Sequence, residues 1–275
     1  MNDIRKPSAS LTILTALAAE AEILAGRKKF KKEANVFILE QHSSKSGTTA
    51  IIQCGIGRDR LLRVAVPQLG NSSVVGNIGV SGGLASDLTP GTVILGDQIL
   101  TSAHQHTGYR ASYTPNAQLL NILEASLKEN AFPYRRGPIL CSPQPIESPE
   151  NKAAAHLKTG ALAVDMESAG AAEAARQAGL PFFCIRVVCD PAGRRVEKKL
   201  FVGVDKEGNN QPMQLIRPLI REPWLVAHLF MMARDFTQAL ASMQRVWNIA
   251  CKPLVTLDLT IANGDSTTRA PYGDL

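Results

Sequence analysis

The chain has 275 residues, of which 45% are hydrophobic, and carries a formal net charge of +6. This size and apolar content suffice for one large domain with a full core, and they exclude a chain that is disordered throughout. The positive charge favours anionic partners, but only 5% of the residues are aromatic and they do not alternate with basic residues, so we expect no nucleic-acid partner. The five cysteines lack CxxC spacing and lie mostly in apolar runs, which is typical of reduced thiols in a cytoplasmic protein.

The first predicted element is a strand over residues 11–17, which runs directly into a helix carrying Glu20 and Glu22. These glutamates interrupt the apolar stretch and no small-residue cleavage site follows it, so we do not expect a signal peptide. Glu20 stands where the strand ends and the helix begins. A carboxylate at that position is either exposed in the first helical turn, where the helix dipole favours it, or directed into a site at the sheet edge.

A second strand-to-helix junction contains two glycines. A predicted strand over residues 50–54 is followed by the run Gly55-Ile56-Gly57-Arg58 and by a helix that extends to residue 68. This order lets backbone N–H groups approach an anion, and Gly57 and Arg58 are therefore candidate anion-binding residues. A tight turn explains the glycines equally well, because the third glycine of a dinucleotide site and the lysine of a P-loop are missing.

Three more glycines follow the next predicted strand. That strand covers residues 74–78, and the run Gly79-Val80-Ser81-Gly82-Gly83 stands at its end, before a further strand over residues 92–100. Several strands that end in glycine or in a carboxylate predict an enclosed small-molecule pocket at one sheet edge.

The middle of the chain contains a His-x-His pair and little else that indicates a site. His104 and His106 have no third His or Cys and no paired carboxylate close in sequence, so we expect polar loop residues and no metal site. A helix is predicted over residues 116–129, and a short strand over residues 139–143 leads into a loop that could cover the pocket.

The chain is organised around residues 160–193. There an apolar run ends in Asp165-Met166-Glu167, a helix follows, and a second apolar run ends at Asp190. Helix crossovers almost always join parallel strands, so we expect both strands to end at the same sheet edge and to place Glu167 and Asp190 in one pocket. Alternatively, Glu167 only occupies a favourable first helical turn, and Asp190 only opens a turn.

The C-terminal part is predicted to be helical. A hairpin candidate over residues 200–211 precedes an apolar-rich helix over residues 223–243, in which polar residues are too frequent for a bilayer span. This helix packs on the core or on another subunit, or it docks at a membrane surface. We expect one domain over residues 1–254, with a helical extension over residues 213–254, and a flexible polar tail over residues 255–275.

Five segments, in their order and spacing, resemble the purine nucleoside phosphorylase and methylthioadenosine/S-adenosylhomocysteine nucleosidase superfamily. They are Gly55-Ile56-Gly57, Asn77-Ile78-Gly79-Val80-Ser81-Gly82-Gly83-Leu84, Pro90-Gly91, Val164-Asp165-Met166-Glu167-Ser168 and Arg186-Val187-Val188-Cys189-Asp190. The resemblance implies an α/β fold, a three-layer α/β/α sandwich with a mixed central sheet, with a nucleoside pocket at one edge, no cofactor, and a homo-oligomer. Within the superfamily, the Cys-Asp-Pro-Ala run, the hairpin and the helical C-terminus resemble the hopanoid-associated phosphorylases, which act on adenosylhopane.

The resemblance also implies roles for individual residues. Glu167 would accept hydrogen bonds from the ribose hydroxyls, Asp190 would protonate the base, and Glu20 would orient water. The remaining substrate-binding residues would be Met166, which packs against the sugar, with Ser81, Gly82, Gly83 and Asp165. These residue types fit the chemistry, because breaking an N-ribosyl bond leaves positive charge on the sugar and negative charge on the base. One carboxyl group must then be protonated while the others stay ionised, and burial favours such a protonated acid.

Two positions depart from the phosphorylase pattern. Phosphorylases of this kind commonly carry Arg at the position of Asn77 and Ser at that of Val80, both serving the phosphate, whereas here the hydroxyl is shifted to Ser81. Arg58 and Arg110 are the candidate replacements. Water is therefore slightly favoured over phosphate as the nucleophile, and phosphorolysis stays open.

The expected partner is a small-molecule or lipid-linked adenine nucleoside, and the favoured function is release of adenine from adenosylhopane in hopanoid lipid biosynthesis. Apolar side chains of the last predicted helix would line an exit for a long hydrocarbon, with transient contact at a membrane surface: Leu225, Val226, Leu229, Phe230, Met231 and Met232, with Leu219 and Trp224 nearby. Alternatively, they fill the core or a subunit interface. A general methylthioadenosine/S-adenosylhomocysteine-type nucleosidase and a non-catalytic nucleoside-binding protein are the other functional hypotheses.

Overall fold

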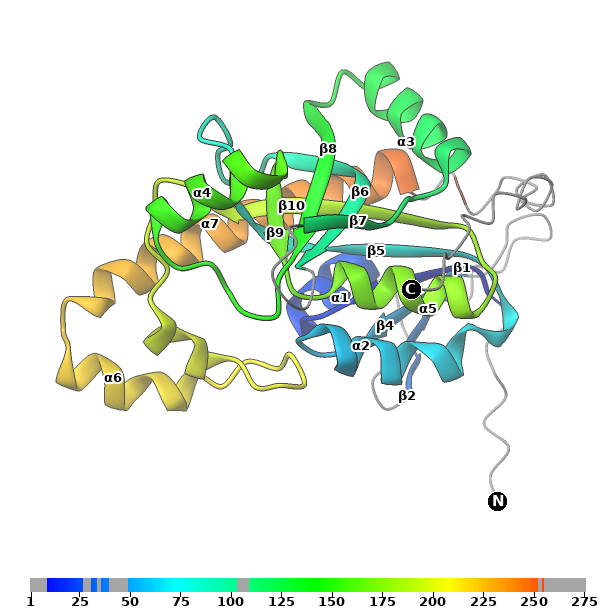
Figure 1. Cartoon of the computed structure of the whole chain (residues 1–275). Coiled ribbons are helices and arrows are strands. Elements are labelled where there is room, and N and C mark those ends of the chain that lie inside the picture. The colour runs from blue at the N-terminus through cyan, green and yellow to red at the C-terminus, as the bar shows by residue number, and fades with distance from the viewer. Residues whose placement is uncertain are drawn as a thin grey trace, which may run out of the picture.

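A computed structural model describes residues 9–26, 31–33, 36–39, 49–102, 109–251 and 254 of the chain. In this part of the chain a ten-stranded mixed sheet is covered by helices (Figure 1). The predicted α/β fold with a mixed central sheet and helical layers is therefore confirmed. His104, His106 and the predicted tail over residues 255–275 lie outside the described residues.

The predicted strands and helices occur in the predicted order, together with elements that were not predicted. The strands are β1 (Ala9–Thr15), β2 (Lys31–Glu33), β3 (Val36–Leu39), β4 (Thr49–Gln53), β5 (Ser72–Gly83), β6 (Val93–Ser102), β7 (Tyr109–Tyr113), β8 (Tyr134–Cys141), β9 (Ala163–Asp165) and β10 (Phe182–Asp190). The α-helices are α1 (Ala18–Ala25), α2 (Arg58–Ala65), α3 (Ala117–Glu129), α4 (Pro149–Thr159), α5 (Ser168–Gln177), α6 (Ile216–Arg221) and α7 (Leu225–Val246). Of these elements, β2, β3, β7, α4 and α6 were not predicted.

Local sequence explains where several helices start. The Asn116 side chain accepts a hydrogen bond from the N–H of Leu119 at the start of α3, and the Ser148 side chain accepts one from the N–H of Asn151 at the start of α4. Each cap satisfies a backbone donor that the first helical turn leaves unpaired. Pro149 follows Ser148, and a proline is well accommodated in a first turn because its missing N–H would be unpaired there anyway.

The strand order is β10-β6-β8-β9-β5-β1-β4-β3-β2, and β10 also pairs with β5. The strands β5, β10, β6, β8 and β9 therefore form a closed ring, from which β1 to β4 continue as an open sheet. Strand β5 belongs to both parts, because β1 pairs with its first half and β9 pairs only with Gly82 and Gly83. The second half of β5 thus lies between β9 and β10.

The predicted parallel arrangement of the strands before and after α5 is wrong. Strand β9 runs antiparallel to β5, whereas β10 runs parallel to β5, so β9 and β10 have opposite directions. Their ends still meet, because Val164 of β9 and Asp190 of β10 are both register partners of Gly82. The ring closure, and not a shared strand direction, brings these two segments together.

The prediction that a strand over residues 74–78 ends before its glycines is also wrong. Strand β5 continues through all of them to Gly83. Glycine normally weakens a strand, but it is found where other groups approach the backbone closely. The Glu20 and Arg186 side chains lie over Gly79, and Asp190 lies beside Gly82 and Gly83, so these groups occupy the space that side chains would fill.

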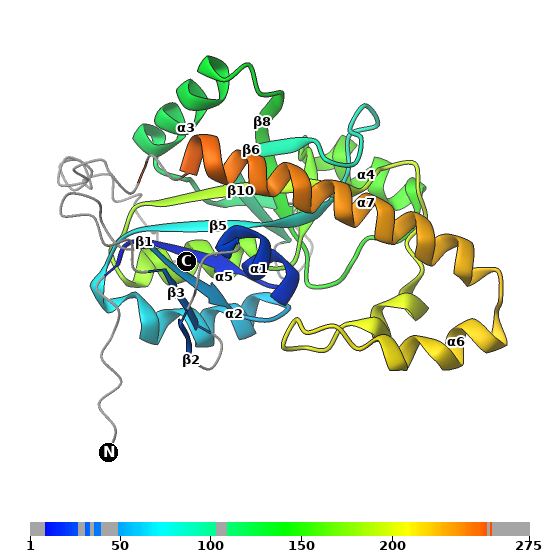
Figure 2. The same cartoon turned by 180° about the vertical axis from the view of Figure 1, so that it is seen from behind.

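Helices cover the sheet on two faces. On one face, α1, α3 and α7 pack on a core that contains Ile13, Ile78, Phe183 and Ile185. Figure 2 shows α7 crossing this face of the sheet beside α1 and α3. On the other face, α2 and α5 pack on a second core that contains Leu14, Ile52, Val75 and Cys184. The alternation of these residues along each strand is what gives the two layers.

The C-terminal segment is helical, as predicted, but its helices and turns begin and end at other residues than predicted. The predicted hairpin over residues 200–211 consists of a 3-10 helix, Lys198–Gly203, followed by a turn closed by a single antiparallel bridge between Val204 and Asn210. The predicted helix over residues 223–243 is α7, which extends to Val246, and a shorter α6 precedes it. Within the described ranges no helix combines the length and the apolar content needed to cross a membrane.

Gly76 should be essential to the packing of the central strands. It is the register partner of Ile13 in β1 and of Phe183 in β10, and an added Cβ would lie 2.6 Å from Ile13 Cδ1 and 2.8 Å from Phe183 Cε1. We expect Gly76→Ala to destabilise the fold by about 1–3 kcal/mol through overpacking, measured as a lower Tm. Gly193→Ala is the control, because nothing lies within 4 Å of its Cβ position. Equal Tm values for the two variants would contradict this account of the core.

Candidate functional site

Acidic and glycine residues stand at or just after the ends of β1, β4, β9 and β10, and β5 passes beside several of them. Glu20 follows β1, Gly57 follows β4, Glu167 follows β9, and Asp190 ends β10. Hydrogen bonds tie Glu20 and Glu167 to neighbouring segments: Val80 of β5 donates its N–H to Glu20 Oε1, and Gly57 donates its N–H to Glu167 Oε1. Asp190 lies beside Gly82 of β5. Residues far apart in the sequence therefore form one acidic cluster.

Glu20 is buried and held by three backbone N–H groups. Its Oε2 accepts from Ala16 and Leu17, each at 2.9 Å, and its Oε1 accepts from Val80 at 2.8 Å. Burial raises the pKa of Glu20, although the three N–H donors and the charge of Arg186 oppose this shift. The alternative that Glu20 is an exposed residue of a first helical turn is excluded by this burial.

Glu167 precedes the first residue of α5 and turns back toward the start of α2. Its Oε1 accepts the Gly57 N–H at 2.7 Å, and its Oε2 accepts the Met166 N–H at 3.2 Å. Burial and the nearby Asp165 charge raise the pKa of Glu167 to about 7, while the Gly57 hydrogen bond and Arg186 act in the opposite direction. Met166 is partly exposed beside it.

Asp165 lies beneath this cluster and is bound to a buried arginine. The Nε of Arg186 donates to Asp165 Oδ2 at 2.5 Å, and the hydroxyl of Ser168 donates to Asp165 Oδ1 at 2.8 Å. Another nitrogen of Arg186 donates to the Asn77 amide oxygen. Burial disfavours the charged form of Arg186, but Asp165 together with the other acidic groups around it, among them Glu167, outweighs this effect and raises the pKa of Arg186. Both oxygens of Asp165, predicted as a substrate ligand, are thus bonded within the protein.

An irregularity in the pairing of β10 with β5 places Asp190 at the site. The register with β5 shifts between Val188 and Asp190, so Asp190 pairs with Gly82. The ammonium group of Lys152, whose side chain is 0% exposed, donates to Asp190 Oδ2 at 2.5 Å. Burial raises the pKa of Asp190, whereas the charge and hydrogen bond of Lys152 lower it. No partner of Asp190 Oδ1 is found among the residues that the structure describes.

The glycines of β5 let the carboxylates approach the strand backbone closely. A Cβ added at Gly79 would lie 3.0 Å from Glu20 Oε1 and 3.1 Å from an Nη atom of Arg186, so both groups border the space over this glycine. A Cβ at Gly82 would lie 3.5 Å from Asp190 Oδ2, and one at Gly83 would lie 3.5 Å from the Asp190 carbonyl oxygen. Ser81 is buried, and its hydroxyl has no hydrogen-bond partner in the described part of the chain. A buried hydroxyl without a partner is costly unless a ligand or water pairs with it.

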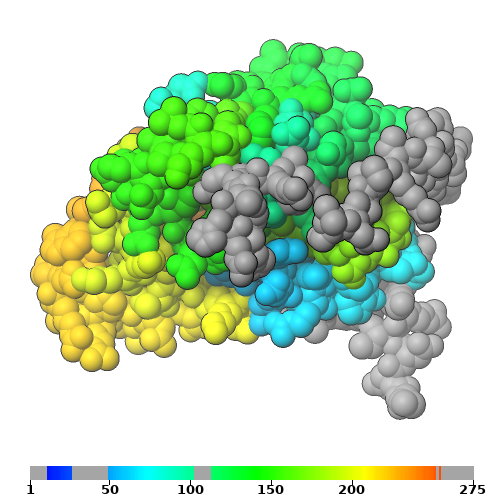
Figure 3. All heavy atoms as spheres, viewed as in Figure 1, coloured from blue at the N-terminus to red at the C-terminus, as the bar shows by residue number. Residues whose placement is uncertain are grey.

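The turn over residues 204–210, which we call the strap, lies against the start of α1 and α2. The carbonyl oxygen of Gly208 accepts the Ala18 N–H at 2.9 Å, and that of Lys206 accepts the Ile56 N–H at 3.0 Å. Figures 1 and 3 show this yellow segment beside the start of α2. Gly208 has φ +83°, and a Cβ there would lie 3.0 Å from Leu17 Cα and overlap the Ala16 carbonyl group. Only glycine fits the strap at this point.

The surroundings of Gly57 and Arg58, the two candidate anion-binding residues, do not favour an anion. The N–H of Gly57 is already donated to Glu167, and Arg58 is exposed to solvent. The amide donor that an anion at Gly57 requires is therefore already used. The side chain of Arg110, the other candidate for phosphate, lies outside the described residues.

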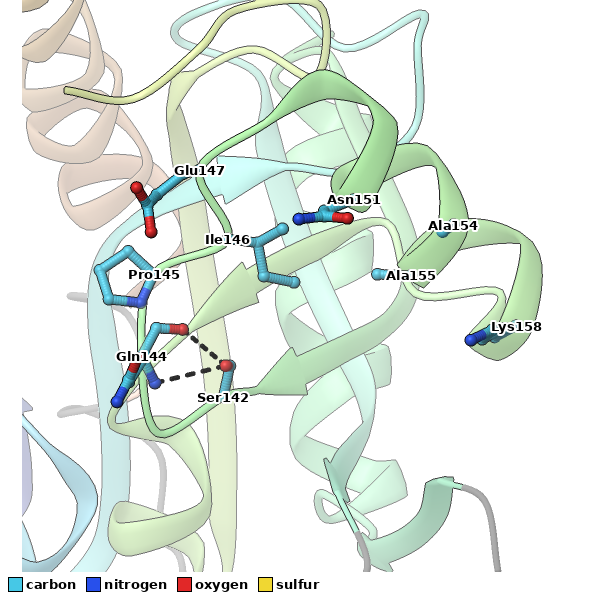
Figure 4. Close-up of a pocket in the computed structure, with 9 residues that line it drawn as sticks. All are labelled: Ser142, Gln144, Pro145, Ile146, Glu147, Asn151, Ala154, Ala155 and Lys158. Atoms are coloured by element: carbon cyan, nitrogen blue, oxygen red, sulfur yellow. Dashed lines mark hydrogen bonds between the residues drawn. The ribbon is translucent and has the colours of Figure 1, made fainter. Parts of the chain in front are cut away.

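A cavity of about 360 Å³ lies next to this cluster but is not lined by any of the predicted site residues. It lies between the loop after β8 and α4, as Figure 4 shows. Its lining residues are Ser142, Gln144, Pro145, Ile146, Glu147, Asn151, Ala154, Ala155 and Lys158. The N–H of Ser142 donates to the Asp165 carbonyl oxygen at 2.8 Å, so the cavity adjoins the carboxylate cluster at the end of β9.

Sequence reasoning assigned no role to Arg186 or Lys152. Arg186 carried a signal, because a charged residue inside an apolar strand needs a buried partner. Lys152 carried none, since it lies in a polar helix where a lysine is normally exposed. Across the described ranges, no cluster of three or more His, Cys, Asp or Glu residues is arranged to hold a metal ion.

Comparison with known proteins places this geometry in a family context. Residues 10–221 match the sequence model of the phosphorylase superfamily. Among solved structures, a putative 5′-methylthioadenosine/S-adenosylhomocysteine nucleosidase from Francisella philomiragia is 17% identical, with a TM-score of 0.65 over 89% of this chain and 97% of that chain. Futalosine hydrolase of Helicobacter pylori is 14% identical, with a TM-score of 0.66 over 90% of this chain and 98% of that chain.

A third similar structure contains a ligand. It is the 5′-methylthioadenosine/S-adenosylhomocysteine nucleosidase from Neisseria meningitidis in complex with methylthio-immucillin-A, which is 17% identical, with a TM-score of 0.63 over 90% of this chain and 98% of that chain. At these identities the three structures show a shared fold.

Glu167 should make the protein less stable at neutral and alkaline pH. Its pKa is raised from 4.5 to about 7 in the folded chain, so ionisation above pH 4.5 favours the unfolded state, and the penalty is complete above pH 7. We expect Glu167→Gln to raise the Tm at pH 8 by at least about 2 °C, the shift that roughly 1 kcal/mol produces, and to raise it less at pH 5. Glu22→Gln, at an exposed position of α1, is the control. A lower Tm for Glu167→Gln at pH 8 would contradict the assignment of a strained buried charge.

Proposed function

The chain belongs to the phosphorylase superfamily, and on this premise we propose that it cleaves the N-ribosyl bond of an adenine nucleoside with water as the nucleophile. The support is the carboxylate cluster at the strand ends, in which three carboxyl groups have different partners. Glu20 is held by backbone N–H groups, Glu167 by the start of α2, and Asp190 by an ammonium group. Different surroundings allow carboxyl groups to act in different protonation states.

Each carboxyl group has a role in the proposed reaction. As the bond between C1′ and the base nitrogen breaks, its electron pair moves to the base, and protonated Asp190 transfers its proton to a base nitrogen. Ionised Glu167 accepts hydrogen bonds from the ribose hydroxyls and stabilises the cationic sugar. A water molecule next to Glu20 attacks C1′ and gives its proton to Glu20. The products are the free base and the free sugar.

The choice of water over phosphate is based on one observation: the backbone N–H groups near the carboxylates already donate hydrogen bonds to other groups of the chain. The N–H groups of Ala16 and Leu17 are donated to Glu20, that of Gly57 to Glu167, and those of Ala18 and Ile56 to the strap. A phosphate at strand and helix ends depends on such N–H groups and on positive charge. Here two carboxylates occupy their place, and like charges repel an anion. A neutral water molecule fits this environment better than phosphate.

The known proteins of similar structure are in line with hydrolysis. Two of them are described as nucleosidases and the third as a hydrolase. Their sequence identity is too low to transfer a substrate, so the adenine base is proposed from the sequence resemblance and from the acid at Asp190. Met166, Ser81, Gly82 and Gly83 would contact the nucleoside beside Glu167 and Asp190.

The surface beyond the strap favours an apolar group at the 5′ end of the nucleoside, as in adenosylhopane. Leu225 is buried in the core, whereas Phe230 is 73% exposed, and both lie on α7. The exposed apolar residues of this segment are Met213, Ile216, Ile220, Trp224, Val226, Phe230 and Met231. They lie on the 3-10 helix Pro212–Leu215, on α6, and just before and on the first half of α7, where they are exposed to solvent; we call these residues the apolar face. An apolar surface of this extent indicates a binding site for a lipid or a partner.

The charge near this face favours a membrane surface over a second copy of the chain. Residues 194–235 contain eight Lys and Arg against five Asp and Glu. An anionic lipid surface attracts such a segment, whereas a symmetric dimer would bring two positive faces together. The lipid-linked substrate would then be taken from a membrane that the enzyme contacts transiently. A general methylthioadenosine-type nucleosidase, with this face in a homo-oligomer, is the alternative.

The activity and the role of Asp190 can be tested together. We expect the purified protein to release adenine without phosphate and to incorporate ¹⁸O from labelled water into the sugar. Asp190→Asn should reduce the rate about 10²–10⁴-fold, because the amide cannot supply the proton, while nucleoside binding persists. Asp59→Asn, at an exposed position of α2, is the control. Strict dependence on phosphate would exclude the hydrolytic proposal, and binding without base release by the wild type would indicate a non-catalytic nucleoside-binding protein.

The apolar face can be tested through substrate preference. We expect an adenosylated polycyclic lipid in detergent to be cleaved with a higher kcat/KM than methylthioadenosine. Phe230→Asp should reduce kcat/KM for the lipid about 10- to 100-fold, as loss of one large apolar contact does, and spare methylthioadenosine. Leu157→Asp is a matched control, because Leu157 is 84% exposed but lies on α4. If methylthioadenosine is the better substrate, the lipid proposal fails and the general nucleosidase remains.

A further inference from the structure

A buried lysine stands behind the proposed acid. Lys152 lies on α4, its side chain is 0% exposed, and its Nζ donates three hydrogen bonds. The acceptors are Asp190 Oδ2 at 2.5 Å, the Arg194 carbonyl oxygen at 2.9 Å and the Pro191 carbonyl oxygen at 3.1 Å. Lysine is almost never fully buried without a partner, so this position requires an explanation.

The three acceptors fix the charge state of Lys152. An ammonium group has three N–H donors and no lone pair, so it matches three oxygen acceptors. An uncharged amine would turn its lone pair toward one of these oxygens and leave that oxygen without a donor. Lys152 is therefore an ammonium ion. Asp190 is its counter-ion in the described part of the chain.

The same contacts fix the turn after β10. Lys152 binds the carbonyl groups of Pro191 and Arg194, and the N–H of Arg194 donates to the Pro191 carbonyl oxygen at 3.1 Å. The Arg194 side chain in turn forms an ion pair with Asp235 of α7. Lys152 thus joins α4, the end of β10 and, through Arg194, α7. It holds Oδ2 of Asp190 and leaves Oδ1 for another partner.

We propose that Lys152 is a positioning residue for the acid Asp190: its ammonium group determines which carboxyl oxygen faces the base and at which pH that oxygen carries a proton. This inference rests on the proposed function and adds to it a residue that does not touch the substrate. Asp190 presents Oδ1 to the base nitrogen while Oδ2 stays on Lys152. The positive charge also keeps Asp190 from being protonated permanently, so the acid is able to release its proton.

Several groups around Asp190 contribute to its protonation. Burial raises the pKa of Asp190 and so does the charge of Asp235 on α7, whereas Lys152 on α4 and Arg194 in the turn lower it. Cys189 is adjacent, and burial raises the pKa of its thiol to about 12, so it adds no charge at neutral pH. Among the influences that lower the pKa of Asp190, the charge of Lys152 is the largest. Its removal leaves the effect of burial largely unopposed, and the pKa of Asp190 rises.

The pH profile separates this role from a merely structural one. The acid works while it is protonated, so activity falls as pH rises through its pKa. Lys152→Met keeps an unbranched side chain that is one atom shorter and removes the charge. We therefore expect the alkaline limb of kcat to move up by about one pH unit or more, the effect of an opposite charge at contact distance. Lys152→Arg should restore the wild-type limb at least in part. Lys158→Met, an exposed lysine on the same helix, is the control.

A second measurement does not depend on turnover. Titration of ¹³C-labelled aspartate by NMR, with Asp190→Asn used for assignment, should show a higher pKa of Asp190 in Lys152→Met or, if that variant does not fold, in Lys152→Gln. An unchanged pKa and an unchanged alkaline limb would overturn the inference and leave Lys152 with a structural role. If the wild type released no base from any nucleoside, the proposed function would fail, and the NMR titration would still decide whether Lys152 controls Asp190.

Discussion

The buried ion pair between Arg186 and Asp165 is the interaction on which the acidic cluster depends. Arg186 is buried within β10, donates to Asp165 and Asn77, and lies close enough to Glu20 and Glu167 to oppose the rise that burial causes in their pKa values. Several carboxylates gathered in a buried region repel one another, and one cation at their centre makes the arrangement tolerable. Removal of one member of such a buried pair typically costs about 3–5 kcal/mol. The sheet therefore contains its counter-charge in the strand that ends at Asp190.

The second constraint is that backbone N–H groups near the carboxylates donate their hydrogen bonds to other groups of the same chain. In folds of this kind, the ends of strands and the starts of helices offer N–H groups to anionic ligands. Here Glu20, Glu167 and the strap accept these groups, and Gly208 lets the strap approach the Ala16 and Leu17 backbone. These N–H groups are thus already paired within the chain, which is the basis for proposing water and not phosphate as the nucleophile. The same contacts hold Glu20 and Glu167 in fixed orientations, which is what a site needs for repeated catalysis.

Stability and function oppose each other at these carboxyl groups. Burial raises the pKa values of Glu20, Glu167 and Asp190, so each carries a free-energy penalty when it ionises in the folded chain. Proteins tolerate such strain where chemistry requires it. The three groups are nevertheless not equivalent, because Lys152 lies against Asp190 whereas backbone N–H groups hold Glu20. This difference in partners is the physical basis for assigning one group as the acid and the others as anions.

The sequence by itself determined the order of the main strands and helices and the placement of Glu20, Glu167 and Asp190 at the ends of elements, because apolar periodicity and helix starts are local properties. It also indicated glycines beside them. It did not indicate β2, β3, β7, α4 or α6. Only the tertiary structure decided that β9 runs antiparallel to β5, that β5 continues through its glycines, and that the ring closes between β5 and β10. These features depend on hydrogen bonds between strands far apart in the chain. The tertiary structure also decided that Arg186 and Lys152 are the partners of the carboxyl groups. The effect of a charged side chain depends on the groups that surround it after burial, and sequence spacing does not show which groups these are.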